Sequence, residues 1–283
     1  MLMNFSLTVE KASKAILGES PLWDWRENVL YFVDIEGQSI RRYSPETKEE
    51  KVIPTPQKVG TIGLCKDGRL LAAMEDGIYF VENDSFKIAH QSIKIEGERF
   101  NDGKVGPDGR FYAGTLSREG KGAFYRLDAD GMLTKLFGGV YTSNGLAWSH
   151  DSKTFYYIDT HYRRIDSFSF DSEEGKISGG VTVYDFVDER PDGMSIDSDG
   201  NLHAALWASG KVVTIEPTKG ALLNTLLTPA SQTSCTAFGG RDLQTMFITT
   251  SCRDLENIHK EILGGMLFSI RMPVKGVKAN LFG

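Results

Sequence analysis

A short pattern recurs six times along this chain, and its spacing constrains the fold more than any other feature. Each copy contains a few apolar residues, a polar turn and a second apolar segment, as in "GTIGLCKDGRLLAA" at residues 60–73. The turns are marked by Glu27, Asp67, Asp108, Asp151, Asp199 and Asp242. Successive markers lie 40, 41, 43, 48 and 43 residues apart. A period of about 40–45 residues with several strands per unit is typical of a β-propeller. The six copies therefore predict an all-β protein with six blades.

The residues around the turns indicate four-stranded antiparallel blades around a central channel. Asp-Gly pairs at 67–68, 108–109 and 199–200 supply the positive φ angles that tight hairpins need. The segments that follow the turns, such as "VLYFVD" (29–34), are almost wholly apolar, as expected for sheets packed face to face. Less regular stretches after them would form the outer two strands of each blade. The first strand of each blade is expected to line the channel.

The two ends of the chain are expected to close the ring. We expect residues 5–10 to pair beside residues 264–272, so that the N- and C-terminal strands lie in one blade. The single helical turn that the sequence indicates is "DLENIHKEI" (254–262). We find no linker, and residues 1–283 are therefore predicted to form a single domain.

Charge and composition exclude several classes of partner. The net charge of −6 argues against nucleic acid, which favours a basic face. No apolar run approaches the roughly 20 residues that span a bilayer. The N-terminal residues lack the pattern of a secretory signal, and the three cysteines form no C-x-x-C motif. We therefore expect a cytoplasmic protein with no membrane partner, as a monomer or weak homo-oligomer.

One position in the repeat is chemically unusual. Seven residues before the turn markers of five units stand Gly60, Asn101, Asn144, Asp192 and Cys235, and eight residues before the first marker stands Glu19. The first strands of all blades begin at the same end of the ring. Four oxygen-bearing side chains, Glu19, Asn101, Asn144 and Asp192, are therefore expected to converge near the axis.

Convergent carboxylates repel each other, and a divalent cation would relieve that repulsion. Carboxylate and amide oxygens are hard ligands, which suit Ca²⁺, Mg²⁺ or Mn²⁺. Taken singly, Asn144-Gly145 and Pro191-Asp192-Gly193 are also ordinary turn sequences, and Asn101 begins a third. Glu19 on its own is compatible with simple exposure. Because each unit already has its turn seven residues later, the repeat favours a metal site.

Two residues near these four polar side chains are candidate substrate contacts. Arg99 stands two residues before Asn101, on the same side of an extended segment. It can bind an anionic or polyhydroxyl substrate, or it can form a surface salt bridge. Glu119 lies in the loop "SREGKG", where it is either a substrate contact at the rim or a solvated charge.

Several segments together resemble the regucalcin/gluconolactonase family of six-bladed propellers. They are "LGESPLWD", "RFNDGKVGPDGRFYAGT", "SNGLAWS", "FYYIDT", "RPDGMSID" and "TSCTAFGG", and they span nearly the whole chain in order. The resemblance implies a metal-dependent lactonase that opens aldonolactone rings such as gluconolactone. It implies the metal ligands Glu19, Asn144 and Asp192. It also implies sugar contacts from Arg99 and Asn101, and more loosely from Glu119, whose loop is shorter here.

The resulting hypothesis is hydrolysis of a sugar lactone on one divalent ion. Ca²⁺ is the first choice, with Zn²⁺, Mn²⁺, Mg²⁺ and Fe²⁺ as alternatives. Asp192 is the candidate general base, acting as metal ligand and base together, because the charge of the metal would keep it ionised near pH 7. Two other functions remain open: phosphotriesterase or aryl-esterase activity on the same metal, and a non-enzymatic calcium-binding regulator. The sequence does not identify the sugar.

Overall fold

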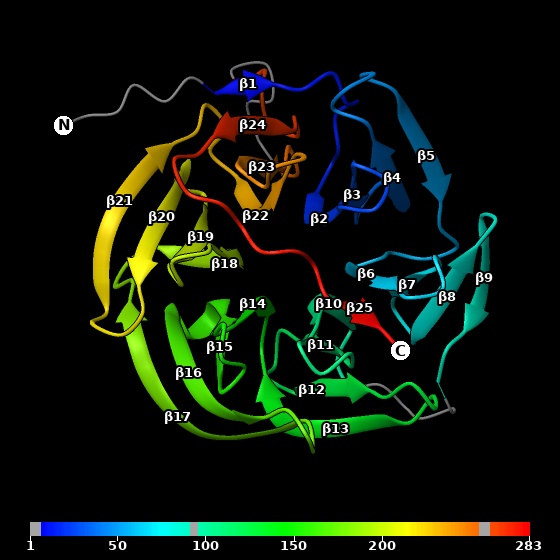
Figure 1. The fold of residues 1–283 in the computed structure, drawn as a ribbon, viewed down its shortest axis with the longest axis vertical. Helices are drawn as coiled ribbons and strands as arrows, with labels where there is room; N and C mark the ends of the chain where they lie inside the picture. Colours follow the sequence, from blue (N-terminus) through cyan, green and yellow to red (C-terminus); the bar gives the residue numbers. More distant parts are fainter. Residues whose placement is uncertain (1–6, 91–95, 255–260) are drawn as a thin grey trace.

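The computed structural model describes residues 7–90, 96–254 and 261–283. In this part of the chain, six sheets surround a central axis, seen end-on in Figure 1. Within every sheet, strands adjacent in sequence pair in antiparallel fashion. The fold is a six-bladed β-propeller, as the repeat predicts.

Each blade contributes four strands from the axis outwards. The first strands are β2 (Gly18–Asp24), β6 (Thr61–Cys65), β10 (Arg99–Val105), β14 (Ser143–Trp148), β18 (Arg190–Ile196) and β22 (Thr233–Gly239). The second strands are β3 (Val29–Asp34), β7 (Leu70–Ala73), β11 (Phe111–Leu116), β15 (Thr154–Asp159), β19 (Leu202–Trp207) and β23 (Thr245–Thr250). The third strands are β4 (Ser39–Tyr43), β8 (Ile78–Glu82), β12 (Gly122–Leu127), β16 (Arg164–Asp171), β20 (Lys211–Glu216) and β24 (Phe268–Arg271). The outer strands are β5 (Glu50–Pro54), β9 (Ser85–Ile88), β13 (Leu133–Val140), β17 (Lys176–Asp185), β21 (Ala221–Leu227) and β1 (Thr8–Val9). We number the blades I to VI from β2 to β22.

The core lies between the blades. Each pair of neighbouring blades encloses its own buried cluster, such as Val33 with Ile62 between blades I and II. All six residues of β3 are buried, because both faces of its sheet are covered by neighbours. Since these clusters follow one another around the ring, we propose that residues 1–283 form one domain.

The predicted hairpin turns are confirmed. Gly68, Gly109 and Gly200 have φ values of 92°, 76° and 86°, in the left-handed region that glycine adopts without strain. Each of them follows an Asp and connects the first strand of its blade to the second.

The ring closes as expected, but the chain then continues further. Strand β1 pairs antiparallel with β24, with Thr8 opposite Ser269, in the sheet β1-β24-β23-β22. The C-terminal strap, which we define as residues 273–283, crosses the channel in Figure 1 and ends in β25 (Leu281–Phe282). Strand β25 pairs parallel with β6 of blade II. The sequence did not predict this strap, and residues 255–260 of the expected helical turn lie outside the described residues.

Two further observations concern the cysteines and the absence of apolar spans noted in the sequence. Cys65, Cys235 and Cys252 are free thiols. Among the described residues, no helix has the length and apolarity to cross a bilayer.

Candidate functional site

The four aligned polar residues lie at the start of channel-lining strands. Glu19, Asn101, Asn144 and Asp192 each occupy one of the first three positions of β2, β10, β14 and β18. In each of these strands the pairing with the second strand shifts register at this point. Such β-bulges redirect side chains out of the regular alternation.

Gly145 and Gly193, which directly follow Asn144 and Asp192, permit close packing and form no hairpin. A Cβ on Gly193 would lie 2.2 Å from Sγ of Cys235 in blade VI. A Cβ on Gly145 would lie 2.6 Å from Cβ of Met194 in blade V. Adjacent first strands therefore approach each other too closely for any side chain at these positions.

A chain of hydrogen bonds connects the polar residues of blades III and IV. Nη1 of Arg99 donates to Oδ1 of Asn101 at 2.6 Å. Nδ2 of Asn101 donates to Oδ1 of Asn144 at 3.0 Å and to the Ser143 carbonyl at 2.6 Å. Arg99 is buried, so its position does not correspond to the surface salt bridge that was its alternative. Its proximity to Asn101 was predicted.

Thr160 continues this chain into blade V. Nδ2 of Asn144 donates to Oγ1 of Thr160 at 2.7 Å, and that hydroxyl donates to the Pro191 carbonyl at 2.7 Å. Thr160 begins the short 3₁₀ helix η1 (Thr160–Tyr162), which Asp159 caps by accepting from the backbone N–H of His161. The amide of Asn144 is thereby oriented, and one lone pair of its Oδ1 is left for a further ligand.

Glu19 and Asp192 are buried carboxylates at the same end of the channel as Asn101 and Asn144. We call this end, where the four residues begin their strands, the carboxylate layer. Burial, followed by repulsion from Asp102, raises the pKa of Glu19 to about 8. Burial, with repulsion from Glu19 and Asp102, raises the pKa of Asp192 well above its usual range. Within the described residues neither carboxylate forms an ion pair, and the nearby positive charge of Arg99 offsets their burial and mutual repulsion only in part.

Asp102 is a third buried carboxylate in the channel that sequence reasoning missed. Its Oδ1 accepts from the backbone N–H of Gly103 at 2.7 Å, and burial raises its pKa. Regular alternation would direct Asp102 away from Asn101, but the register shift between Phe100 and Gly103 removes that alternation. Its position in the "NDG" triplet was the available signal, and that triplet resembled a turn.

The donor set fits a hard divalent cation. Two buried carboxylates and an oriented amide supply three oxygen ligands, and burying them together is costly unless a cation is bound. Among the described residues, no group of three or more His, Cys, Asp or Glu side chains is arranged to hold a metal ion. The candidate set accordingly depends on Asn144 as its third member.

Glu119 does not join this cluster in the structure. It is exposed in the loop that follows β11, where it forms an ion pair with Lys121. Its contact with a substrate stays a prediction.

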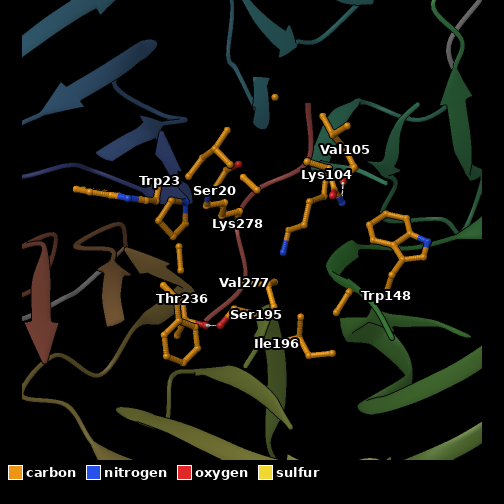
Figure 2. A pocket seen from close by; sticks show the side chains of 18 of the residues that line it. Ser20, Trp23, Lys104, Val105, Trp148, Ser195, Ile196, Thr236, Val277 and Lys278 are labelled. Atoms are coloured by element: carbon orange, nitrogen blue, oxygen red, sulfur yellow. Dashed lines mark hydrogen bonds between the residues drawn. The ribbon is translucent and has the colours of Figure 1, made fainter. Parts of the chain in front are cut away.

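A cavity of about 320 Å³ occupies the opposite half of the channel, towards the ends of the first strands. Trp23, Trp148 and Phe238 contribute its aromatic walls, and strap residues 277–280 line it as well. Figure 2 shows the side chains around this cavity, with Lys104 extending into it. Cys235 and Asp102 also line the cavity, so the cavity extends along the channel as far as the carboxylate layer.

Solved structures share this architecture along the whole chain. A luciferin-regenerating enzyme is 27% identical, with a TM-score of 0.91 and coverage of 99% of both chains. A calcium-binding protein, regucalcin, from Agrobacterium tumefaciens has a TM-score of 0.92, with coverage of 99% of this chain and 98% of its own. At 24% identity, the second likeness speaks for the fold alone.

Sequence comparison identifies the family. Residues 17–252 match the SMP-30/Gluconolactonase/LRE-like region. The Bacillus subtilis protein YvrE, whose name assigns it as a sugar lactone lactonase, is 38% identical over 95% of both chains. Regucalcin of Xenopus laevis is 34% identical over 94% of both chains. The chain belongs to the SMP-30/gluconolactonase/LRE-like family, which confirms the resemblance noted in its motifs.

Proposed function

We propose that this protein hydrolyses a sugar lactone to the corresponding aldonic acid and that it requires a divalent metal ion. The observation that carries the proposal is the pair of buried carboxylates, Glu19 and Asp192, beside the oriented amide of Asn144. Membership of a family whose relatives include a protein named as a sugar lactone lactonase supports the substrate class.

Glu19, Asn144 and Asp192 would hold the ion, with Ca²⁺ as the first choice and Zn²⁺, Mn²⁺, Mg²⁺ or Fe²⁺ as alternatives. When bound, a divalent ion acts as a Lewis acid that stabilises negative charge on the lactone carbonyl oxygen. Beside such an ion, Glu19 and Asp192 would stay ionised near neutral pH, because its positive charge would offset their mutual repulsion.

The residues of this chain would bind the substrate and move one proton. Arg99 would donate to the sugar hydroxyls from its guanidinium group, and Asn101 would accept from them with the lone pair of Oδ1 that Arg99 leaves unused, because its Nδ2 already donates to Asn144 and Ser143. Asp192 accepts a proton from a water molecule while the oxygen of that water attacks the carbonyl carbon of the lactone. The ring C–O bond then breaks, and the departing oxygen takes up that proton to give the hydroxy acid. Glu119 would contact the substrate from the rim.

The test is an activity panel on metal-free protein reconstituted with each metal in turn. We expect hydrolysis of sugar lactones that depends on added metal. Faster turnover of organophosphates or aryl esters than of lactones would instead favour the esterase alternative. Stoichiometric Ca²⁺ binding without turnover of any substrate would favour a calcium-binding protein. A cytoplasmic location and a monomeric or weakly associating state are further predictions.

A further inference from the structure

The side chain of Lys104 connects three blades across the channel. Lys104 belongs to β10 of blade III, and its stem extends into the cavity in Figure 2. Its Nζ donates to the Leu146 carbonyl of blade IV at 2.9 Å and to the Met194 carbonyl of blade V at 2.9 Å. A single ammonium group therefore holds the backbones of two neighbouring strands.

The two carbonyls belong to the segments that carry candidate metal ligands. Leu146 and Met194 each stand two residues after a candidate ligand, Asn144 or Asp192. They are also the residues at which regular pairing resumes after the bulge, opposite Tyr157 and Ala204 respectively. The bulges interrupt the ladder at the ligands themselves, so the backbone there depends on contacts outside the ladder.

No ladder sets the distance between blades IV and V at this level, because β14 and β18 belong to separate sheets. Thr160 links the two strands at the carboxylate layer, through Asn144 and the Pro191 carbonyl. Lys104 links them again two residues further along. Two links at different depths fix both the spacing and the relative tilt of the two strands, which a single link cannot do.

The chemistry of Lys104 suits this bridging role better than a role in an ion pair. Within the described residues its ammonium has no carboxylate partner at salt-bridge distance, and both of its observed partners are backbone carbonyls. Lys104 is half-buried, although a lysine usually keeps its charged end in water.

We propose that Lys104 is a positioning residue that sets the spacing of Asn144 and Asp192 for metal binding. This inference rests on the proposed metal-dependent function and deepens it. Residues outside the ligand set that orient the ligands typically change metal affinity by about 10–100-fold when they are removed.

The experiment compares Lys104→Met with Lys278→Met. Both changes remove an ammonium group near the same cavity, but Lys278 lies over the Trp25 ring at 4.3 Å. Calorimetric titration of metal-free protein with Ca²⁺ should give a Kd about 10–100-fold higher for Lys104→Met. Lys278→Met should stay within about 2-fold of wild type, since no ligand strand depends on it. At saturating Ca²⁺, Lys104→Met should lower kcat for a sugar lactone about 10-fold with KM unchanged, because Arg99 and Asn101 remain in place.

Equal Ca²⁺ affinities of Lys104→Met and Lys278→Met would overturn the proposal while leaving the metal site intact. Wild-type protein that binds no divalent ion would instead overturn the proposed function, and the role of Lys104 with it. If Lys104→Met fails to fold, Lys104→Gln tests the same point, since its shorter amide side chain retains a donor. Ca²⁺ affinity in Lys104→Gln should fall about 3–10-fold, and wild-type affinity would overturn the proposal.

Discussion

Blade V contains the dipeptide Asp-Gly twice, and the two copies have different physical roles. Asp199-Gly200 forms the hairpin turn: Asp199 is exposed, Gly200 has a φ of 86°, and the nearest atom to an added Cβ is His150 Cδ2 at 4.0 Å. Asp192-Gly193 lies seven residues earlier inside strand β18, where Asp192 is buried. A Cβ on Gly193 would collide with Cys235. At the turn, glycine is needed for its backbone angle, whereas in the channel it is needed for its lack of volume.

The largest expected difference between the two copies is in activity. Asp192→Asn removes the candidate base and weakens a candidate metal ligand, so kcat/KM for a sugar lactone should fall about 10³-fold. Asp199→Asn should stay within about 2-fold of wild type, because Asp199 is exposed at the turn. Steady-state kinetics at saturating metal measures both. Full activity of Asp192→Asn would remove Asp192 from the proposed chemistry.

The two glycines should differ in their effect on stability. Gly193→Ala forces a methyl group against the Cys235 side chain and backbone, and should lower the free energy of unfolding by about 3 kcal/mol. Gly200→Ala places a side chain at positive φ without a clash, and should cost about 1 kcal/mol. Urea unfolding of the metal-free proteins gives both values. Equal losses would show that crowding does not distinguish the two positions.

The buried carboxylates should also make the stability of the metal-free protein depend on pH. The pKa of Glu19 is raised to about 8, above its value in the unfolded chain, so the folded state holds the extra proton between these two values. Stability is therefore fully present below the unfolded-state pKa of about 4.3 and is lost as the pH rises to the folded-state pKa of about 8, a loss on the order of 5 kcal/mol. Saturating Ca²⁺ should abolish this loss. Thermal unfolding at several pH values tests it, and an unchanged slope with Ca²⁺ would contradict metal binding at Glu19.

Asp197, which lies beside the Asp199-Gly200 turn, should make stability depend on pH in the opposite direction. Burial raises the pKa of Asp197, but hydrogen bonds from His203 and from the backbone N–H of Asn201 outweigh it, and the net pKa is lowered. The stabilisation is therefore present above the unfolded-state pKa of about 4 and is lost as the pH falls through the lower folded-state pKa. Asp197→Asn should cost about 1–2 kcal/mol at pH 7.

The cost of Asp197→Asn should shrink towards pH 3, because the carboxylate becomes protonated in the unfolded wild-type chain before it does so in the folded protein. Urea unfolding at pH 7 and pH 3 measures this change. A cost that is the same at both pH values would mean that the charge of Asp197 does not stabilise the folded state.

Sequence spacing predicted the blades because each blade is a local unit with its own turn. The markers from Glu27 to Asp242 identify six hairpins, and the closure of β1 on β24 follows from the need to complete the last sheet. The strap was not predictable in this way. Its contacts, such as Leu281 opposite Leu64, join residues far apart in sequence and follow no repeat.

The candidate site was predicted where the repeat register applies, and missed where the register breaks. Counting back from the turns found Asn101, Asn144 and Asp192, because the hairpin fixes their distance from the turn. Asp102 and Lys104 were missed because the bulge in β10 changes which side chains face the channel. The role of Thr160 arises from a contact between blades, which spacing within one repeat does not reveal.

Anomalous diffraction tests most directly whether Asp192 is a metal ligand and Asp199 only a turn residue. Crystals of the protein grown with Mn²⁺ would be measured at a wavelength where manganese scatters anomalously. We expect one strong peak in the channel, within about 2.0–2.4 Å of oxygens of Glu19, Asn144 and Asp192. The peak should be much weaker in crystals of Asp192→Asn, which loses a charged ligand, and should keep its wild-type height in those of Asp199→Asn. A wild-type channel without a peak, or a peak of undiminished height in Asp192→Asn, would contradict the assignment of Asp192 as a metal ligand.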